Sequence, residues 1–309
     1  MRAQIGVYVV LGLLALIAPF LGLYPVFLMK LLCFAMFACA FNLLLGFTKM
    51  LSFGHAAYFG ASAYVTGWLV TAMGWGTVAG ILGGVAVSML LGLVIGAIAV
   101  RRQGIYFAMI TLALAQVVYF ICLEANFTGG ENGLQGIPRG SILGVVGLGD
   151  DRTMYYFVLA VFAGVYVLIR RIVHSPFGQV LKAIRANEPR AISLGYKVDR
   201  YKLTAFVISA SLSGLAGSLK ALVLGFVTLS DVSQGNSGEV ILMTLLGGSG
   251  TFLGPVIGAN LVVTLQEYLS DVVGAWVSVI IGAIFVVCVL IFRRGFVGEI
   301  QRRFARRAA

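Results

Sequence analysis

Long apolar segments separated by short polar connections follow one another along most of the chain. Runs of about 20 residues, the length that crosses a hydrocarbon core, begin near the N-terminus and recur up to residue 292. A soluble core does not need runs this long, so the pattern predicts membrane-spanning helices. The predicted crossings lie at 5–23, 26–47, 54–73, 77–100, 105–123, 154–170, 203–224, 237–249, 254–269 and 273–292.

Two of the predicted crossings are interrupted. The segments near 54–73 and 237–257 are short and rich in glycine, so each is expected to be a re-entrant or broken helix. Irregular backbone at membrane depth is tolerated where it packs against protein or lines a cavity. The predicted fold class is therefore all-α, a polytopic membrane helix bundle of about 8–10 transmembrane helices that includes broken or re-entrant segments.

Composition agrees with a membrane protein. Hydrophobic residues make up 60% of the chain, charged residues make up 11%, and the mean hydropathy is +1.02. Soluble domains carry about 25% charged residues. The 22 Lys and Arg exceed the 11 Asp and Glu, but they form no groove-like patch with interleaved aromatic residues, which argues against a nucleic-acid partner.

The distribution of charge predicts the orientation. Basic residues gather at 101–102, 170–202 and 293–307, at the ends of alternate apolar runs, which places these connections and both termini in the cytoplasm. Acidic residues lie in the opposite connections and support this scheme. They are Glu124, Glu131, Asp150, Asp151, Asp231, Glu267 and Asp271.

The cysteines and the first apolar run add no separate function. The four cysteines lie within apolar runs without the paired spacing of a metal or redox site, so they are expected to be packing residues. They are Cys33, Cys39, Cys122 and Cys288. The first run has no clear small-x-small cleavage site and leads straight into the next, which favours an uncleaved helix over a signal peptide.

The longest basic connection, residues 174–202, has the pattern of a short amphipathic helix. Pro176 can start a helix, and Pro189 ends or kinks one. Between them an apolar stripe recurs at helical spacing, at Val180, Leu181 and Ile184. A helix of this kind is expected to lie across the cytoplasmic ends of the spans as a docking element. The alternative is a solvated basic loop bound to anionic lipid.

Several segments resemble, in order, those of the branched-chain amino-acid ABC transporter permease family. They are LLLGFTKMLSFGHAAYFGASAY (43–64), GIYFAMITLALAQ (104–116), TGGENGLQGIP (128–138), GQVLKAIRANEPRAISLGY (178–196) and GEVILMTLLGGSGTFLGPVIGA (238–259). Together they run through most of the chain, which makes the resemblance specific. One departure is Lys49, where related sequences more often have a small residue.

The resemblance implies an inner-membrane, multi-pass permease subunit of a bacterial high-affinity Leu/Ile/Val importer. The implied partners are a second homologous permease subunit, two cytoplasmic ATPases that carry ATP and Mg²⁺, a periplasmic substrate-binding protein and the lipid bilayer. Residues 1–309 would form one permease domain with a cytoplasmic coupling loop at 174–202 and a basic cytoplasmic tail at 293–309. The residues implied for coupling to the ATPase are Gln179, Lys182, Ala183, Arg185, Asn187, Glu188, Ala191 and Gly195.

Residue spacing in the chain gives no sign of an enzyme or of a bound cofactor. There is no Gly-x-x-x-x-Gly-Lys phosphate-binding loop, so ATP would be hydrolysed by another chain. Neither His55 nor His174 has metal-ligand spacing with another His, Cys or carboxylate. His55 either packs at the start of an interrupted helix or touches the transport path. The polar residues Asn42, Gln116 and Asn260 either line that path or bridge helices.

The connection 128–138 has the glycines and the proline of an ordered outer loop. Its polar side chains would face the binding protein, although a solvated turn without a partner is the competing interpretation. They are Thr128, Glu131, Asn132 and Gln135.

Small residues recur at four-residue spacing, which lets helix backbones approach closely in lipid. The pairs are Gly80/Gly84, Gly92/Gly96, Ser213/Gly217 and Gly250/Gly254/Gly258. A weak internal echo links two segments, Leu-Leu-Gly at 44–46 and Leu-Leu-Gly at 245–247, each followed by Phe and Gly. Repeated halves of this kind occur in transporters, with the substrate path between interrupted segments.

Two alternatives stay open at the level of sequence. Permeases for urea, other amides or other amino acids share much of this pattern. An ion-coupled secondary transporter would need an ionisable residue near the membrane midplane, whereas the candidates Lys30, Lys220 and Glu239 lie nearer the span ends. The scarcity of ionic residues at span centres favours a weak, polar and apolar conduit for a zwitterionic substrate.

Overall fold

In the computed structural model, the described residues are 12, 14–20, 22, 24–142, 146–276, 279–284 and 286, and they are mostly helical. The long helices are α2 (Pro25–Thr48), α3 (His55–Thr71), α4 (Thr77–Ala99), α5 (Ile105–Glu124), α6 (Asp151–His174), α9 (Val198–Leu224), α10 (Gln234–Gly247) and α11 (Gly254–Val273). The short helices are α7 (Pro176–Ala186), α8 (Glu188–Ser193) and the 3₁₀ segments η1 (Ala18–Phe20), η2 (Asn126–Thr128), η3 (Gly130–Asn132), η4 (Leu229–Asp231) and η5 (Gly274–Trp276). The strands have two residues each: β1 (Leu134–Gln135), β2 (Ser141–Ile142), β3 (Val146–Gly147) and β4 (Phe226–Val227).

Five described helices are long and apolar enough to cross a membrane, namely α2, α4, α5, α6 and α9. The chain is therefore a polytopic helical membrane protein, as predicted. Helices α6 and α9 extend beyond their apolar runs into the basic connection, because hydrogen bonding along a helix continues past the hydrocarbon core. The predicted crossings at 5–23 and 273–292, the tail at 293–309 and Cys288 lie wholly or largely outside the described residues.

The two glycine-rich segments fold differently from each other. Helix α3 is continuous and mostly buried, but its 17 residues are fewer than a full span needs. The second segment is broken between α10 and α11, where Gly248 and Gly250 adopt φ values of 114° and 82°. Because side chains with a Cβ rarely adopt such values, these glycines permit the break.

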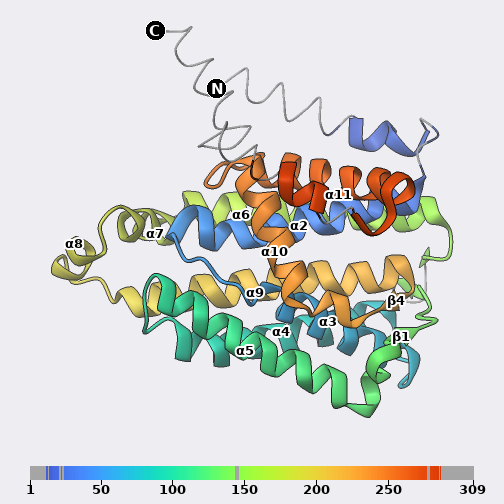
Figure 1. The fold of residues 1–309 in the computed structure, drawn as a ribbon, viewed down its shortest axis with the longest axis horizontal. Helices are drawn as coiled ribbons and strands as arrows, with labels where there is room; N and C mark the ends of the chain where they lie inside the picture. Colours follow the sequence, from blue (N-terminus) through green and yellow to red (C-terminus); the bar gives the residue numbers. More distant parts are fainter. Residues whose placement is uncertain are drawn as a thin grey trace, which may run out of the picture.

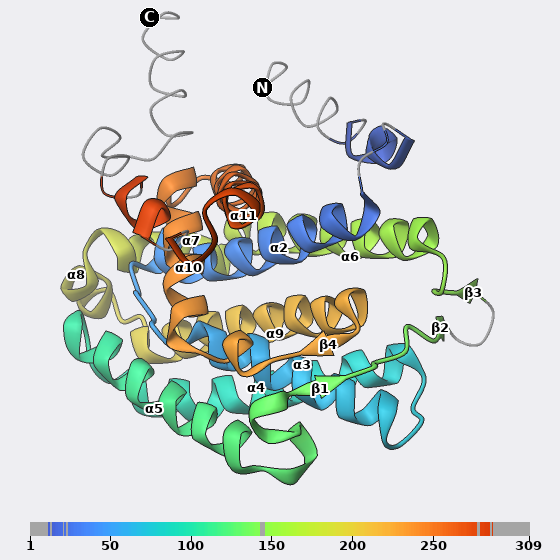
Figure 2. The same ribbon diagram turned by 45° about the vertical axis from the view of Figure 1, so that its right-hand side comes forward.

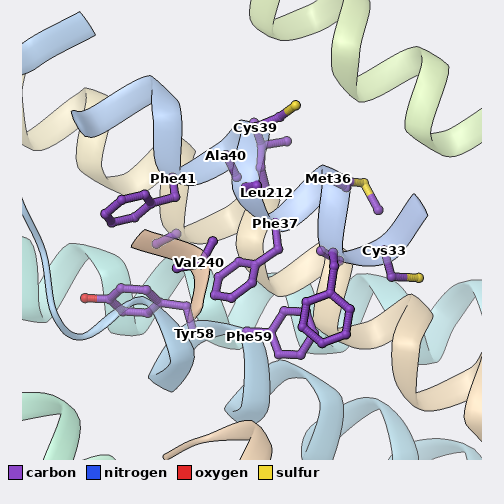
Figure 3. Packing of buried hydrophobic residues seen from close by; sticks show 14 of the residues in the cluster. Cys33, Met36, Phe37, Cys39, Ala40, Phe41, Tyr58, Phe59, Leu212 and Val240 are labelled. Atoms are coloured by element: carbon purple, nitrogen blue, oxygen red, sulfur yellow. The ribbon is translucent and has the colours of Figure 1, made fainter. Parts of the chain in front are cut away.

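Aromatic side chains from α2 and α3 form the centre of the core (Figure 3). Phe37 and Phe59 lie with their ring centroids 4.6 Å apart, and Leu212 of α9 belongs to the same buried cluster. Cys33 and Cys39 of α2 are buried and free, as is Cys122, in agreement with a packing role.

Helix α9 lies at the centre of the bundle and packs against α2, α3 and α4 (Figure 1). Its Gly217 lies directly against the backbone carbonyl of Phe59, leaving no room for a Cβ. Hydroxyl groups join the same helices: Ser218 Oγ lies 2.6 Å from Ser62 Oγ and 2.8 Å from Thr66 Oγ1. Small and hydroxyl-bearing residues are the usual means by which helices associate in lipid, so the predicted close packing is confirmed here.

The connections separate into two ends of the bundle (Figures 1 and 2). The basic end holds the connections 49–54, 100–104 and 175–197, together with α7 and α8. The acidic end holds the described connections 125–142, 146–150 and 225–233. By the positive-inside rule the basic end faces the cytoplasm.

The strands at the acidic end are not anticipated by an all-α prediction. Strand β1 pairs with β4 in antiparallel register, Leu134 opposite Val227, and β2 pairs with β3. Two-residue strands give too little alternation to be recognised in a sequence. The pairing of β1 with β4 holds the 128–138 loop against the end of α9.

Candidate coupling site and transport path

Helix α7 lies at the basic end, beside the ends of α2 and α6 (Figure 1). Ser175 caps it, because its Oγ accepts a hydrogen bond from Gly178 N at 3.3 Å, and Pro176 stands in the first turn. Leu181 and Ile184 are buried, whereas Gln179 is exposed. The amphipathic helix predicted between the two prolines is confirmed.

Pro189 has a different place from the one expected. Helix α7 ends at Ala186, and Asn187 then caps a second short helix, α8, by accepting a hydrogen bond from Arg190 N at 3.1 Å. Pro189 stands in the first turn of α8, where a proline needs no N–H partner. The predicted docking element therefore folds as two helices, α7 and α8, joined at Asn187.

The candidate coupling residues divide into an outer and an inner group. The exposed ones are Gln179, Ala183, Asn187 and Gly195. The half-buried ones are Lys182, Arg185 and Glu188, while Ala191 is buried in a small cluster with Ile184 and Val198. The outer group is exposed and could contact a partner directly. The inner group is partly or fully covered by the chain itself and supports the conformation of the loop.

Arg185 connects α7 to the interior of the bundle. Its Nη1 donates a hydrogen bond to the carbonyl of Gly46 at the end of α2. The same guanidinium lies beside Gly250, where an added Cβ would be 2.9 Å from Nη1. Helix α7 is thus in contact with both α2 and the break between α10 and α11.

Asn42 completes this junction. Its Nδ2 donates to the carbonyl of Thr251 at 2.9 Å, and its Oδ1 accepts from Gly250 N at 2.9 Å. The side chain therefore satisfies both a donor and an acceptor of the broken segment. Asn42 was expected either to line the transport path or to bridge helices. Its hydrogen bonds correspond to the second role. We refer to Asn42, Gly46, Arg185, Gly250 and Thr251 as the coupling junction.

The two segments of the sequence echo meet at this junction. The Leu-Leu-Gly segment at 44–46 lies just before the end of α2 at Thr48, and the one at 245–247 ends α10. Phe47, directly after the first segment, lies with its ring centroid 5.6 Å from that of Phe252, although the echo itself matches Phe252 with Phe53. The sequence did not predict that Gly46, Gly250 and Thr251 lie near Arg185. The repeated Leu-Leu-Gly pattern was the one sequence feature that linked the end of α2 with the end of α10.

His55 is the first residue of α3 and is fully buried. Its side chain does not cap the helix. Its Nε2 lies 2.9 Å from Ser209 Oγ, and that hydroxyl donates to the carbonyl of Ala40 at 2.6 Å. Since the single hydroxyl proton is used there, Nε2 carries the ring proton and donates to Ser209. The contact joins α3, α9 and α2, which corresponds to the packing interpretation.

The other candidate path residues are not assembled into one site. Gln116 is half-buried on α5, and Asn260 donates to the carbonyl of Val256 in its own helix, α11, at 2.9 Å. Among the described residues no hydrogen bond joins any two of Asn42, His55, Gln116 and Asn260. A continuous polar path within this chain is therefore not observed in the described part.

The outer loop presents three of its four candidate contact residues. Glu131, Asn132 and Gln135 are exposed at the acidic end. Thr128 is not available for a partner, because it is fully buried and its Oγ1 donates to the carbonyls of Cys122 and Ala125 at 2.6 and 2.5 Å. A threonine in an outer loop resembles a contact residue in sequence even when, as here, it closes its own turn.

Three ionisable residues within or beside the spans, Lys30, Lys220 and Glu239, are engaged with partners. Lys30 pairs with Glu267 at 2.6 Å. Lys220 contacts both carboxylate oxygens of Asp231 at 2.6 Å in a buried site. Glu239 accepts from Gln266 Nε2 at 3.2 Å. These three residues were the candidates for ion coupling, and each is bound to a neighbouring helix or segment.

A multi-pass helix bundle with an amphipathic docking element at its basic end is the arrangement expected of a membrane permease. Residues 25–289 match the family described as "Branched-chain amino acid transport system / permease component". The chain belongs to this family. It is accordingly a multi-pass inner-membrane protein and a transport component rather than an enzyme.

The chain is similar to several curated permeases. The permease protein LivM of the high-affinity branched-chain amino acid transport system of Escherichia coli (strain K12) is 29% identical over 258 residues, covering 74% of this chain and 60% of that protein. The autoinducer 2 import system permease protein LsrC of Enterobacter sp. (strain 638) is 28% identical over 59% of this chain and 55% of its own length. The ribose import permease protein RbsC of Bacillus subtilis is 28% identical over 54% and 51%. The chain thus spans about three fifths of the LivM relative.

Proposed function

We propose that the chain is the permease subunit of an ATP-binding-cassette importer that carries branched-chain amino acids, Leu, Ile and Val, across the inner membrane. Its partners in this proposal are a second homologous permease subunit, two cytoplasmic ATPases that bind ATP and Mg²⁺, and a periplasmic binding protein. The family and the similarity to LivM support the class of transporter and favour this substrate.

The observation that carries the proposal is the connection between α7 and the bundle. The exposed face of α7 is free to meet an ATPase, while Arg185 on its inner side bonds to Gly46 and lies against Gly250. Closure of the ATPases around nucleotide would displace α7. Because the coupling junction joins α7 to α2 and to the α10–α11 break, the displacement would reach both segments together.

The engagement of the ionisable residues supports a conduit with low affinity. A zwitterionic amino acid held tightly within a span would need a fixed charged or dipolar partner. The charged residues Lys30 and Lys220 are already paired with carboxylates. Capture with high affinity would then fall to the binding protein, and the permease would supply a weak polar and apolar route.

Other substrates are the competing proposal within the same architecture. Urea, other amides and other amino acids are candidates from the sequence, and the similarity to the ribose and autoinducer 2 import permeases adds ribose and autoinducer 2. An ion-coupled carrier has less support, because its three candidate residues are engaged in contacts with their neighbours.

Deletion of residues 179–187 tests the proposal. In vesicles containing the assembled complex, the deletion should abolish ATP-dependent leucine uptake while the chain still inserts into the membrane. Uptake should be measured for leucine, urea and ribose in parallel. Uptake at the wild-type rate by the deletion variant would contradict the coupling role, and saturable uptake of ribose or urea without leucine would contradict the proposed substrate.

A further inference from the structure

A cavity of about 550 Å³ opens at the basic end of the bundle. Its walls come from the connection between α2 and α3, the start of α5, and the two short helices α7 and α8. Five charged side chains line it: Lys49, Arg102, Arg185, Glu188 and Lys202. Four of these carry positive charge and one carries negative charge, so the cavity is strongly cationic.

Two of the four cations, Lys49 and Arg102, have no ion-pair partner among the described residues. Glu188 accepts hydrogen bonds from Lys202 at 2.5 Å and from Gln103 at 2.8 Å, which neutralises the single carboxylate. Arg185 is directed to the carbonyl of Gly46. Within the part of the chain that the structure describes, neither Lys49 nor Arg102 forms an ion pair, which leaves two cations to attract an anion.

The start of α5 lies at the same cavity. Gly104 precedes the helix with φ 61° and has no side chain to cap it, and no other side chain caps it either. Gly104, Ile105 and Phe107 line the cavity. The first N–H groups of a helix and the positive end of its dipole favour negatively charged groups, and phosphate in particular. The cationic side chains and the helix terminus therefore point to the same kind of ligand.

Lys49 is the C-cap of α2 and adopts the left-handed conformation that commonly ends a helix, with a backbone N–H of the cap bonded to the carbonyl of Leu44. Among the described residues it is the one non-glycine residue with positive φ, at 60°. A glycine would adopt this conformation without steric cost. At this position, a charged side chain stands where the backbone alone would favour glycine.

The cavity borders the lipid-facing surface. Ile105 and Tyr106 at the start of α5 are 71% and 69% exposed in a helix apolar enough to span the membrane. The basic end faces the cytoplasm, so this side of the cavity meets the inner leaflet at headgroup depth. An anionic lipid can reach the cavity from there, and cationic pockets at this depth are suited to such headgroups.

We propose that this cavity binds a phosphate group, that Lys49 and Arg102 contact it, and that its source is the headgroup of an anionic phospholipid in the cytoplasmic leaflet. The site is separate from the exposed face of α7 but shares a wall with that helix. A bound headgroup would therefore sit against the inner side of the docking element.

Lipid binding to the delipidated full chain in detergent tests this inference. Native mass spectrometry would measure the affinities for phosphatidylglycerol and phosphatidylcholine, and a parallel titration would use inorganic phosphate. Wild-type protein should bind phosphatidylglycerol at least about fivefold more tightly than phosphatidylcholine, and Lys49→Gly and Arg102→Gln should each weaken that binding about fivefold. The matched control is Arg171→Gln, which removes an exposed cytoplasmic charge outside the cavity. It should change the affinity for phosphatidylglycerol by less than about twofold.

The Lys49→Gly variant separates binding from folding. Because glycine adopts the left-handed cap conformation without steric cost, the thermal midpoint of this variant should be equal to or above that of the wild type even as binding weakens. If inorganic phosphate binds, phosphatidylglycerol does not, and both Lys49→Gly and Arg102→Gln weaken phosphate binding, the phosphate site is supported and its ligand is free phosphate rather than a lipid. Equal binding of the two lipids without any phosphate binding would overturn the inference. The inference would also be overturned if Lys49→Gly and Arg102→Gln weakened binding no more than Arg171→Gln does.

Discussion

Lys220 and Asp231 show how single residues stabilise this bundle from within. The pair is buried, and Asp231 Oδ2 also accepts a hydrogen bond from Thr228 N at 3.1 Å. The Asn236 side chain donates to the Asp231 carbonyl at 3.1 Å. One ion pair thus fixes the connection between α9 and α10. The position of Lys220 was visible in the sequence, but its partner was not, because spacing along a chain does not specify which charges meet in a turn.

Removal of one member of this pair should be far more costly than removal of both. Lys220→Met leaves a buried carboxylate without its cation and should lower the free energy of unfolding by roughly 3 kcal/mol or more. The double variant Lys220→Met, Asp231→Asn should recover much of that loss. Thermal or chemical unfolding in detergent measures both. Strictly additive effects would show that the pair is not coupled.

Gly217 tests the close approach of α9 to α3. A Cβ at this position would overlap the backbone carbonyl of Phe59, which cannot move as a side chain can. Gly217→Ala should therefore lower the free energy of unfolding by about 1–3 kcal/mol. The control is Gly164→Ala in α6, where an added Cβ meets open space. This substitution should raise the free energy of unfolding by about 0.5–1 kcal/mol. Equal effects at the two positions would show that the α3–α9 contact is looser than described.

At the scale of elements, the predicted helices agree with the observed ones wherever an apolar run is long. Periodicity and length are local properties, so α2, α4 and α5 could be placed to within a few residues. The docking element was also predicted, because Pro176 and an apolar stripe define an amphipathic helix locally. Its second helix was missed, because Pro189 can either end one helix or begin the next.

The coupling junction could not be predicted from the sequence. Asn42 and Gly250 are separated by more than 200 positions, and no periodicity links them. The residue types were nevertheless informative: an asparagine within a span and a glycine at positive φ both need an unusual environment. The sequence could identify which residues were unusual, while the structure was needed to show that they contact one another.

Arg185 should be essential for coupling but not for assembly. Arg185→Gln removes the charge-assisted hydrogen bond from α7 to the Gly46 carbonyl, a contact worth about 1.5–3 kcal/mol. In the assembled complex, stimulation of ATP hydrolysis by the loaded binding protein should fall about tenfold, while the ATPase still co-purifies with the permease. Arg185→Lys, which keeps one charged donor, should restore part of the stimulation.

The control for this prediction is Arg171→Gln, which removes an exposed charge at the same end of the bundle. It should leave the stimulation near the wild-type value. If Arg185→Gln also retains normal stimulation, the contact with Gly46 is structural and the coupling junction does not transmit motion. Loss of co-purification in Arg185→Gln would instead place Arg185 in the ATPase contact itself.

At the scale of the whole molecule, the bundle has a basic end that carries the short helices α7 and α8 and an acidic end that carries short strands. The charges that predicted this polarity are spread along the whole sequence, so the orientation could be inferred before the fold. The transport path could not, because its candidate residues, Asn42, His55, Gln116 and Asn260, lie on four different helices. If the path forms between two permease subunits, a single chain carries only half of its lining.

The measurement that tests the central claim most directly is leucine uptake into sealed vesicles with defined energy sources. With the second permease, both ATPases and the loaded binding protein present, uptake should require ATP and should persist after ion gradients are collapsed. The chain without ATPase subunits should give no accumulation under an imposed proton or sodium gradient. Accumulation driven by an ion gradient in the absence of any ATPase would contradict the account.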